Sequence, residues 1–270
     1  LANSRKHGGR CIAGIDPASG AWIRPVSDLD DGRVERATRL IDGREPQLGE
    51  RLVVPLSSSG PGFGCQGENR SIQSGRWRSM GALDWNGLRA LADSEELILH
   101  NDENYVTVEY LRSLPREHRR TLQLVEAFDF RVYSTGLSAN GGHKWRGTFV
   151  NRHGRCMTGM VTDPLMVERL ESGHRPPEHC LITVSLSMPY RPDDWEGDDN
   201  PCWKLIAAVI APEPRPVSGD STEVRSHTAA PPRASLENVD GKNLHAALRS
   251  VFGFESFRPG QERIVRAILG

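Results

Sequence analysis

The sequence lacks several features that would assign it to a class of protein. No apolar run approaches the about 18 residues that a membrane-spanning helix needs, and the amino terminus lacks the charged-then-apolar layout of a secretion signal. No dinucleotide-binding glycine loop, nucleophile elbow or paired-carboxylate motif occurs, and no string has the form G-x-x-x-x-G-K-[ST], which holds nucleotide phosphates. We therefore predict a cytoplasmic chain with no membrane partner and no catalytic residues.

Cysteine is scarce and scattered. The five cysteines are odd in number and form no C-x-x-C pair, which indicates reduced thiols. They are Cys11, Cys65, Cys156, Cys180 and Cys202. The nearest approach to a zinc pattern is His153 and Cys156 followed by His174, His179 and Cys180, and its spacing matches no common ligand set. We therefore predict no metal site.

Lysine is also scarce, since only four of the 34 basic residues are lysines, and the net charge is −1. A nearly neutral chain argues against a uniformly basic nucleic-acid-binding surface, so any such binding must come from local patches. Arginine binds phosphate bidentately and stacks on bases better than lysine does. A codon bias towards arginine in a GC-rich genome explains the same excess equally well.

What the sequence does contain is two sets of short apolar strands separated by turns. The first set comprises residues 10–15, 21–25, 51–56 and 105–110, with a helix expected over 88–99. The second comprises residues 122–133, 141–150, 155–162, 180–188 and 203–211. Residues 105–110 are either a strand throughout or run into a helical turn towards Leu114. Together these patterns predict a mainly β fold with two OB-like small barrels, at residues 1–121 and 122–211.

The composition changes after the second set. Residues 212–238 are rich in Pro, Ser, Thr and charge and carry almost no large apolar side chain, which predicts a disordered linker. Beyond it, Asp240 can cap a helix with Leu244, Leu248 and Val251 at helical spacing. We expect residues 239–270 to form a short α-helical segment.

Three strings in the strand-rich region carry a resemblance to a known family. They are residues 3–14 (NSRKHGGRCIAG), 22–27 (WIRPVS) and 202–210 (CWKLIAAVI). These strings resemble the bacterial dual OB-containing domain family. The resemblance agrees with the two barrels that the strand pattern predicts.

A second resemblance lies in the last stretch, where aromatic residues lead through Arg258-Pro-Gly-Gln261 into an amphipathic helix. An aromatic ring can stack on a purine, and a Gln amide can bind the N6/N7 edge of adenine. Residues 252–269 resemble the adenine-recognising Q motif that opens the motor domain of RecQ-type superfamily 2 DNA helicases. The resemblance implies that Phe254 stacks on adenine, and that Arg258 and Gln261 are the arginine and the glutamine of the motif. A short amphipathic helix docked on a core is the alternative.

The helicase resemblance also implies a function for a longer protein. Such a protein would unwind DNA with ATP and Mg²⁺ in repair, recombination or defence against foreign DNA. Because the phosphate-binding loop is missing, we expect the sequence to be an excerpt cut before the motor chemistry begins. We expect this chain to bind neither ATP nor Mg²⁺ by itself, and to be inactive as an ATP hydrolase.

The strongest candidate for nucleic-acid binding is residues 141–155, which contain several cations and no acid. Because side chains alternate across a strand, Lys144 and Arg146 are expected on one face and Trp145 and Phe149 on the other. Either both rings face the core, or Trp145 contributes to binding together with the basic residues. The predicted binding residues in this segment are Lys144, Trp145, Arg146, Arg152 and Arg155.

A second basic group, Arg5, Lys6, Arg10 and Arg24, surrounds the predicted hairpin of residues 10–25. We predict that both groups bind single-stranded or structured DNA and present it to the motor. The alternative reading is a protein-docking module that recruits a helicase to protein partners without touching DNA. In that case these charges are solvated surface.

Overall fold

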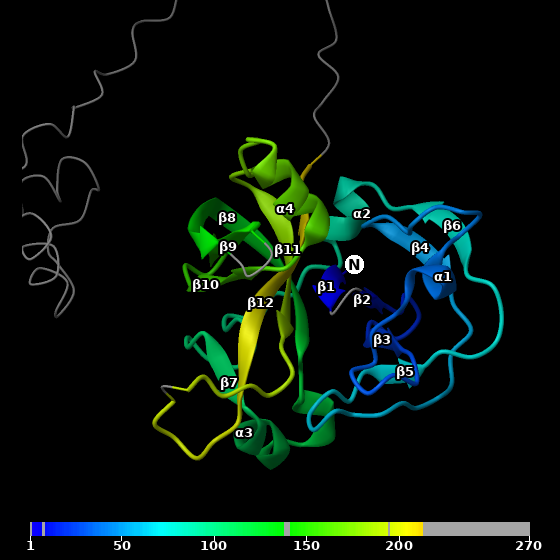
Figure 1. Ribbon diagram of the computed structural model, residues 1–270, viewed down its shortest axis with the longest axis horizontal. Coiled ribbons are helices and arrows are strands. Elements are labelled where there is room, and N and C mark those ends of the chain that lie inside the picture. The colour runs from blue at the N-terminus through cyan, green and yellow to red at the C-terminus, as the bar shows by residue number, and fades with distance from the viewer. Residues whose placement is uncertain (1, 7–8, 138–140, 194, 213–270) are drawn as a thin grey trace, which may run out of the picture. The chain divides into compact units, whose positions relative to one another are not determined.

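The computed structural model describes residues 2–6, 9–137, 141–193 and 195–212 (Figure 1). By internal contacts the chain divides into two units, Leu1–Arg215 and Pro216–Gly270, and the second lies wholly outside the described residues. The predicted linker from residue 213 and the predicted helical segment 239–270 therefore lie outside them too. So do Phe254, Arg258 and Gln261.

The second half of the first unit is a closed five-stranded barrel (Figure 1). Its strands are β8 (Leu122–Leu137), β9 (His143–Asn151), β10 (Cys156–Val161), β11 (Cys180–Leu186) and β12 (Pro201–Ile210). They are hydrogen-bonded in the order β10-β9-β8-β11-β12, and a parallel pairing of β10 with β12 closes the ring. A five-stranded barrel of this kind is the OB architecture. The OB-like barrel predicted for this region is confirmed.

Small residues allow the barrel to close. A Cβ atom on Gly159 would lie 2.6 Å from the carbonyl oxygen of Lys204, so a glycine is needed where β10 approaches β12. On β9, a Cβ atom on Gly147 would lie 2.6 Å from both Phe130 and Ile206, which fill the interior. The ring therefore closes at positions where the backbones and core side chains leave no room for a methyl group.

Helix α4 (Pro164–Glu171) connects β10 to β11 and was not predicted. Its start is fixed by Asp163, whose Oδ1 accepts hydrogen bonds from the backbone N–H groups of Leu165 and Met166. The other oxygen of this buried carboxylate accepts from the N–H of Val209 on β12. Asp163 therefore both caps the helix and ties it to the barrel.

The part of the first unit that precedes β8, which we call the first half, forms two smaller sheets. Strands β1 (Ala2–Lys6), β2 (Gly9–Ile15), β3 (Trp22–Val26) and β5 (Asn69–Ser71) form one sheet in this order, and β4 (Glu50–Val53) pairs with β6 (Arg78–Ala82). The predicted hairpin is confirmed, since Gly14 lies opposite Ile23 and Gly20 takes a positive φ of 70° in the turn. Among the described residues, these pairings do not close into a ring, in contrast to the barrel of the second half.

The remaining elements are short. They are α1 (Arg36–Arg39), α2 (Trp85–Arg89), β7 (Tyr105–Thr107), α3 (Val108–Ser113) and the 3₁₀ turn η1 (Arg116–His118). The long helix predicted over 88–99 is wrong, because the chain leaves α2 after one turn and the N–H of Asp93 bonds to the carbonyl of Leu124 on β8. The helical-turn alternative at 105–110 is confirmed by β7 and α3. No helix in the described part of the chain is long and apolar enough to cross a membrane.

The first half covers one side of the barrel. Leu124 of β8 and Leu181 of β11 point out of the barrel and pack with Leu88 of α2 and with Trp22. Strand β7 joins the barrel sheet by pairing with β12. In Figure 1, β9 and β10 lie on the other side of β11 and β12 from β2 to β6. The predicted division of the chain at residue 121 stays a prediction.

Candidate nucleic-acid interface

The uncovered side of the barrel is the outer surface of β10, β9 and the second half of β8. The strand register places Arg146 between Tyr133 and Met160, and Thr148 between Arg131 and Thr158. We call this surface the open sheet face. Its outward side chains are Phe128, Arg131, Tyr133, Lys144, Arg146, Thr148, Val150, Cys156, Thr158 and Met160.

The outward side chains of the open sheet face include three cations, and one exposed carboxylate, Asp129, lies beside them at the bulge in β8. Arg131 and Lys144 are exposed and Arg146 is half-buried. Within the described residues, no ion pair involves any of the three. The surface therefore has a local positive charge that the nearly neutral chain does not reveal as a whole.

Two aromatic rings lie on the same face. Tyr133 is 47% exposed and Phe128 is 36% exposed. Phe128 and Arg131 are three residues apart, a spacing that puts side chains on opposite sides of a regular strand. A register shift between them, with Asp129 at a positive φ of 52°, brings both to the outer side. Phe128, Arg131 and Tyr133 were not predicted as site residues, because the regular alternation of side chains along a strand does not reveal this bulge.

The predicted alternation around Trp145 is confirmed, and it places the rings on the core side. Phe149 is fully buried in the core of the barrel. Trp145 is half-buried against the same core, and its Nε1–H donates to Oε1 of Glu171 on α4 at 3.3 Å. Its indole therefore does not lie on the open sheet face, and of the predicted residues only Lys144 and Arg146 do.

Arg152 and Arg155 hold the turn between β9 and β10 in place. Arg152 donates to Oε2 of Glu126 at 2.9 Å, while Arg155 pairs with Glu96 and, at 3.1 Å, with Asp102. The hydrogen bond from Arg155 keeps the pKa of Glu96 below its ordinary value. These two predicted cations are therefore already paired with carboxylates.

The second predicted group does not form one basic surface in the described residues. Arg24 is only 3% exposed, and its Nη2 donates to Oε1 of Glu68 at 2.9 Å and to Thr121. Its guanidinium group is therefore buried and paired, so the prediction that Arg24 belongs to a basic surface is wrong. Arg5 lies opposite Arg10 in the β1–β2 pairing, but the side chains of Arg5 and Lys6 lie outside the described residues.

The loop between β11 and β12 has the opposite charge. Residues 187–200 contain five acidic residues and one arginine. Within this loop, the ring of Trp195 packs edge-on against Tyr105 and Trp203, with ring centroids 5.0 and 5.8 Å apart. A nucleic acid on the open sheet face would therefore be repelled at this end of the barrel.

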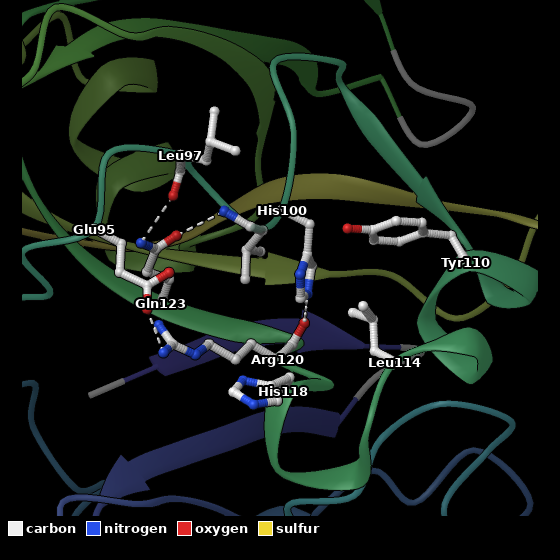
Figure 2. Close-up of a pocket in the computed structure, with 9 residues that line it drawn as sticks. Glu95, Leu97, His100, Tyr110, Leu114, His118, Arg120 and Gln123 are labelled. Carbon is white, nitrogen blue, oxygen red and sulfur yellow. Dashed lines mark hydrogen bonds and ion pairs between the residues drawn. The ribbon is translucent and has the colours of Figure 1, made fainter.

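A pocket of about 300 Å³ lies beside residues 94–100 (Figure 2), and none of its lining residues belongs to the open sheet face. Some of its polar groups bond to one another: Gln123 bonds to Leu97 O and Leu99 N, and His100 bonds to the carbonyl of Arg120. Burial lowers the pKa of His100, which favours the neutral ring. These hydrogen bonds therefore stabilise the loop of residues 94–100.

Among the described residues, no group of three or more His, Cys, Asp or Glu side chains is placed to hold a metal ion.

Comparison with known proteins adds the family. The family model of the dual OB-containing domain matches residues 1–209, which includes both halves of the described unit. The chain belongs to the dual OB-containing domain family. No curated protein and no solved structure matches it. The resemblance of residues 252–269 to RecQ-type helicases lies beyond the matched residues and stays a prediction.

Proposed function

We propose that the open sheet face binds single-stranded DNA. OB folds bind oligonucleotides on the face of their second and third strands, which correspond to β9 and β10 in this barrel. The observation that carries the proposal is a net positive surface with two exposed rings and with three cations that form no ion pair within the described residues, on the side of the barrel that the first half leaves uncovered.

The roles of the residues follow from their position. Arg131, Lys144 and Arg146 bind successive phosphates, and the exposed ring of Tyr133 stacks on a base. Stacking on an aromatic ring contributes about 1–3 kcal/mol per base and is tolerant of sequence. Thr148 and Thr158, whose hydroxyl oxygens are 2.8 Å apart, supply uncharged hydrogen-bonding groups between the cations.

The salt dependence of binding tests this proposal. Affinity for a fluorescent oligothymidine, measured by anisotropy, should fall with salt at a log-log slope of about 0.7 per phosphate contact. Replacing Arg131, Lys144 and Arg146 with Ala should lower the slope by about two units. The matched control replaces Arg76, Arg78 and Arg116, which are also exposed and lie outside the open sheet face, and should leave the slope close to that of the parent.

The alternative is a protein-docking module, and the acidic loop of residues 187–200 is the observation that favours it. Such a loop could recruit a basic protein surface. If the triple variant stays folded and binds single strands like the parent at every salt concentration, the open sheet face is not the site. The docking module then becomes the better reading.

For residues 239–270, we propose the beginning of a RecQ-like motor, with Phe254, Arg258 and Gln261 contacting adenine. ATP and Mg²⁺ belong to a protein that also carries a phosphate-binding loop, because phosphate binding depends on the amides and lysine of that loop. In such a protein, Gln261→Ala should strongly reduce ATP hydrolysis. Normal turnover by this variant would contradict the adenine role.

A further inference from the structure

A buried carboxylate lies where the open sheet face meets α2 of the first half. The side chain of Glu126 on β8 is 2% exposed and accepts three hydrogen bonds. They come from Nε of Arg89 at 2.6 Å, Nη2 of Arg152 at 2.9 Å and Nε2 of His179 at 3.0 Å. One acid thus gathers side chains from α2, from the turn after β9 and from the segment before β11.

The charges of this group do not balance. Burial opposes ionisation of Glu126, but the hydrogen bonds from Arg89 and His179 outweigh it and keep the pKa of the carboxyl below its ordinary value. Glu126 is therefore ionised at neutral pH and neutralises one of the two guanidinium groups. Arg89 and Arg152 are both partly exposed, so a net positive charge is left at the surface.

Aromatic rings accompany this charge. The imidazole of His179 stacks on Phe128 with ring centroids 4.9 Å apart and planes 9° from parallel. Trp85 of α2 meets the same imidazole edge-on at 5.6 Å. We call Arg89, Glu126, Phe128, Arg152 and His179 the Glu126 cluster. It combines exposed cations with an exposed ring, as in surfaces that hold single strands.

The Glu126 cluster continues the open sheet face. Along the outer side of β8, Leu124 and Glu126 are buried and Phe128 emerges into solvent, followed by Arg131 and Tyr133. Phe128 lies opposite Val150, so it belongs to both surfaces. The carboxylate of Glu126 is not exposed on this path, because it is covered and paired.

We infer that a single strand bound on the open sheet face continues across Phe128 to Arg89 and Arg152, so that the binding site spans the barrel and α2 of the first half. This inference rests on the proposed function. A base stacks on the exposed part of the Phe128 ring, while the partly exposed side chains of Arg89 and Arg152 bind the phosphates on either side. Glu126 fixes both arginines without neutralising both.

The test is the dependence of affinity on oligonucleotide length. In the parent protein, affinity for oligothymidines of increasing length should keep rising until the strand reaches the Glu126 cluster. The variant Arg89→Gln with Arg152→Gln keeps two hydrogen-bond donors to Glu126 but removes both positive charges, and it leaves the side chains of the open sheet face unchanged. It should bind short strands like the parent and long strands about tenfold more weakly, with a lower salt slope.

The control is Tyr133→Leu, which lies on the open sheet face and should weaken binding at every length. If Tyr133→Leu weakens binding and the double variant follows the parent at every length, the strand does not reach the cluster and the inference is overturned. The proposed function then still stands. If the parent binds no strand of any length, the proposed function fails and the inference fails with it. Should the double variant unfold early in a thermal melt, Arg89→Gln alone, at a partly exposed side chain, gives the same comparison.

Discussion

At the scale of single residues, the buried lysine Lys204 organises the loop that precedes β7. It is only 3% exposed, and its Nζ donates to the carbonyls of Ile98 and Asn101 at 2.6 Å and to Oδ1 of Asn101 at 2.9 Å. Leu99 and His100, between these acceptors, both take positive φ angles. The ammonium group therefore stabilises a strained backbone segment.

We predict that Lys204→Met lowers the free energy of unfolding by about 2–4 kcal/mol, because three acceptors lose a buried charged donor. Burial lowers the pKa of Lys204 to about 8, below the ordinary 10.5 of a lysine. The unfolded chain thus binds one more proton between about pH 8 and 10.5, so this group makes the folded state more stable as pH rises through that window. Urea denaturation of both proteins at several pH values tests this prediction, since the free energy of unfolding of the parent should rise relative to that of the variant across this pH window. A constant difference would contradict the shifted pKa.

Cys156 offers a direct probe of the open sheet face. It is exposed on that face, whereas burial raises the pKa of the Cys180 thiol to about 12 and makes it unreactive. We predict that maleimide alkylates Cys156 readily and that bound single-stranded DNA slows this reaction several-fold. Mass spectrometry of peptides gives the rate at each cysteine. Equal rates at Cys156 with and without saturating DNA would contradict a strand crossing this end of the face.

Among the elements, the strands of the barrel could be predicted from the sequence because each is an apolar run bounded by turn residues. Helix α4 was missed, although Asp163 before Pro164 is a helix-start signal that could have revealed it. The prediction of a helix over 88–99 was wrong, because the hydrogen bond from Asp93 to Leu124 of β8 overrides the local helix propensity. For the site, alternation gave Lys144 and Arg146, but the bulge at Asp129 and the burial of Arg24 depend on tertiary contacts and could not be predicted.

The pairing of β10 with β12 depends on glycine. We predict that Gly159→Ala destabilises the protein by about 1–3 kcal/mol, because the added methyl group meets the carbonyl of Lys204 and forces the closing strands apart. Gly67→Ala is the control, since a Cβ atom there meets nothing within 4 Å. Chemical denaturation of both variants gives the difference. Equal stability of the two would mean that the barrel does not close as described.

For the whole described unit, the question is whether its two halves fold separately. The outer side of the barrel carries Leu124 and Leu181, which pack with Leu88 and Trp22 of the first half. Arg24, which forms an ion pair with Glu68, also donates a hydrogen bond to Thr121, the residue just before β8. Apolar side chains on the outside of a barrel would face water if the first half unfolded.

We therefore predict that residues 1–212 unfold in one cooperative transition, although the sequence contains two sets of strands. Leu124→Ala, at a residue of the barrel that contacts the first half, should lower the free energy of unfolding by about 2–5 kcal/mol. Because the contact is shared, the variant should lose hydrogen-exchange protection in both halves together, at β3 as well as at β11. Calorimetry and hydrogen exchange on the same samples provide the measurement. Two separate transitions, with only the barrel affected by Leu124→Ala, would show instead that the halves are independent domains divided near residue 121.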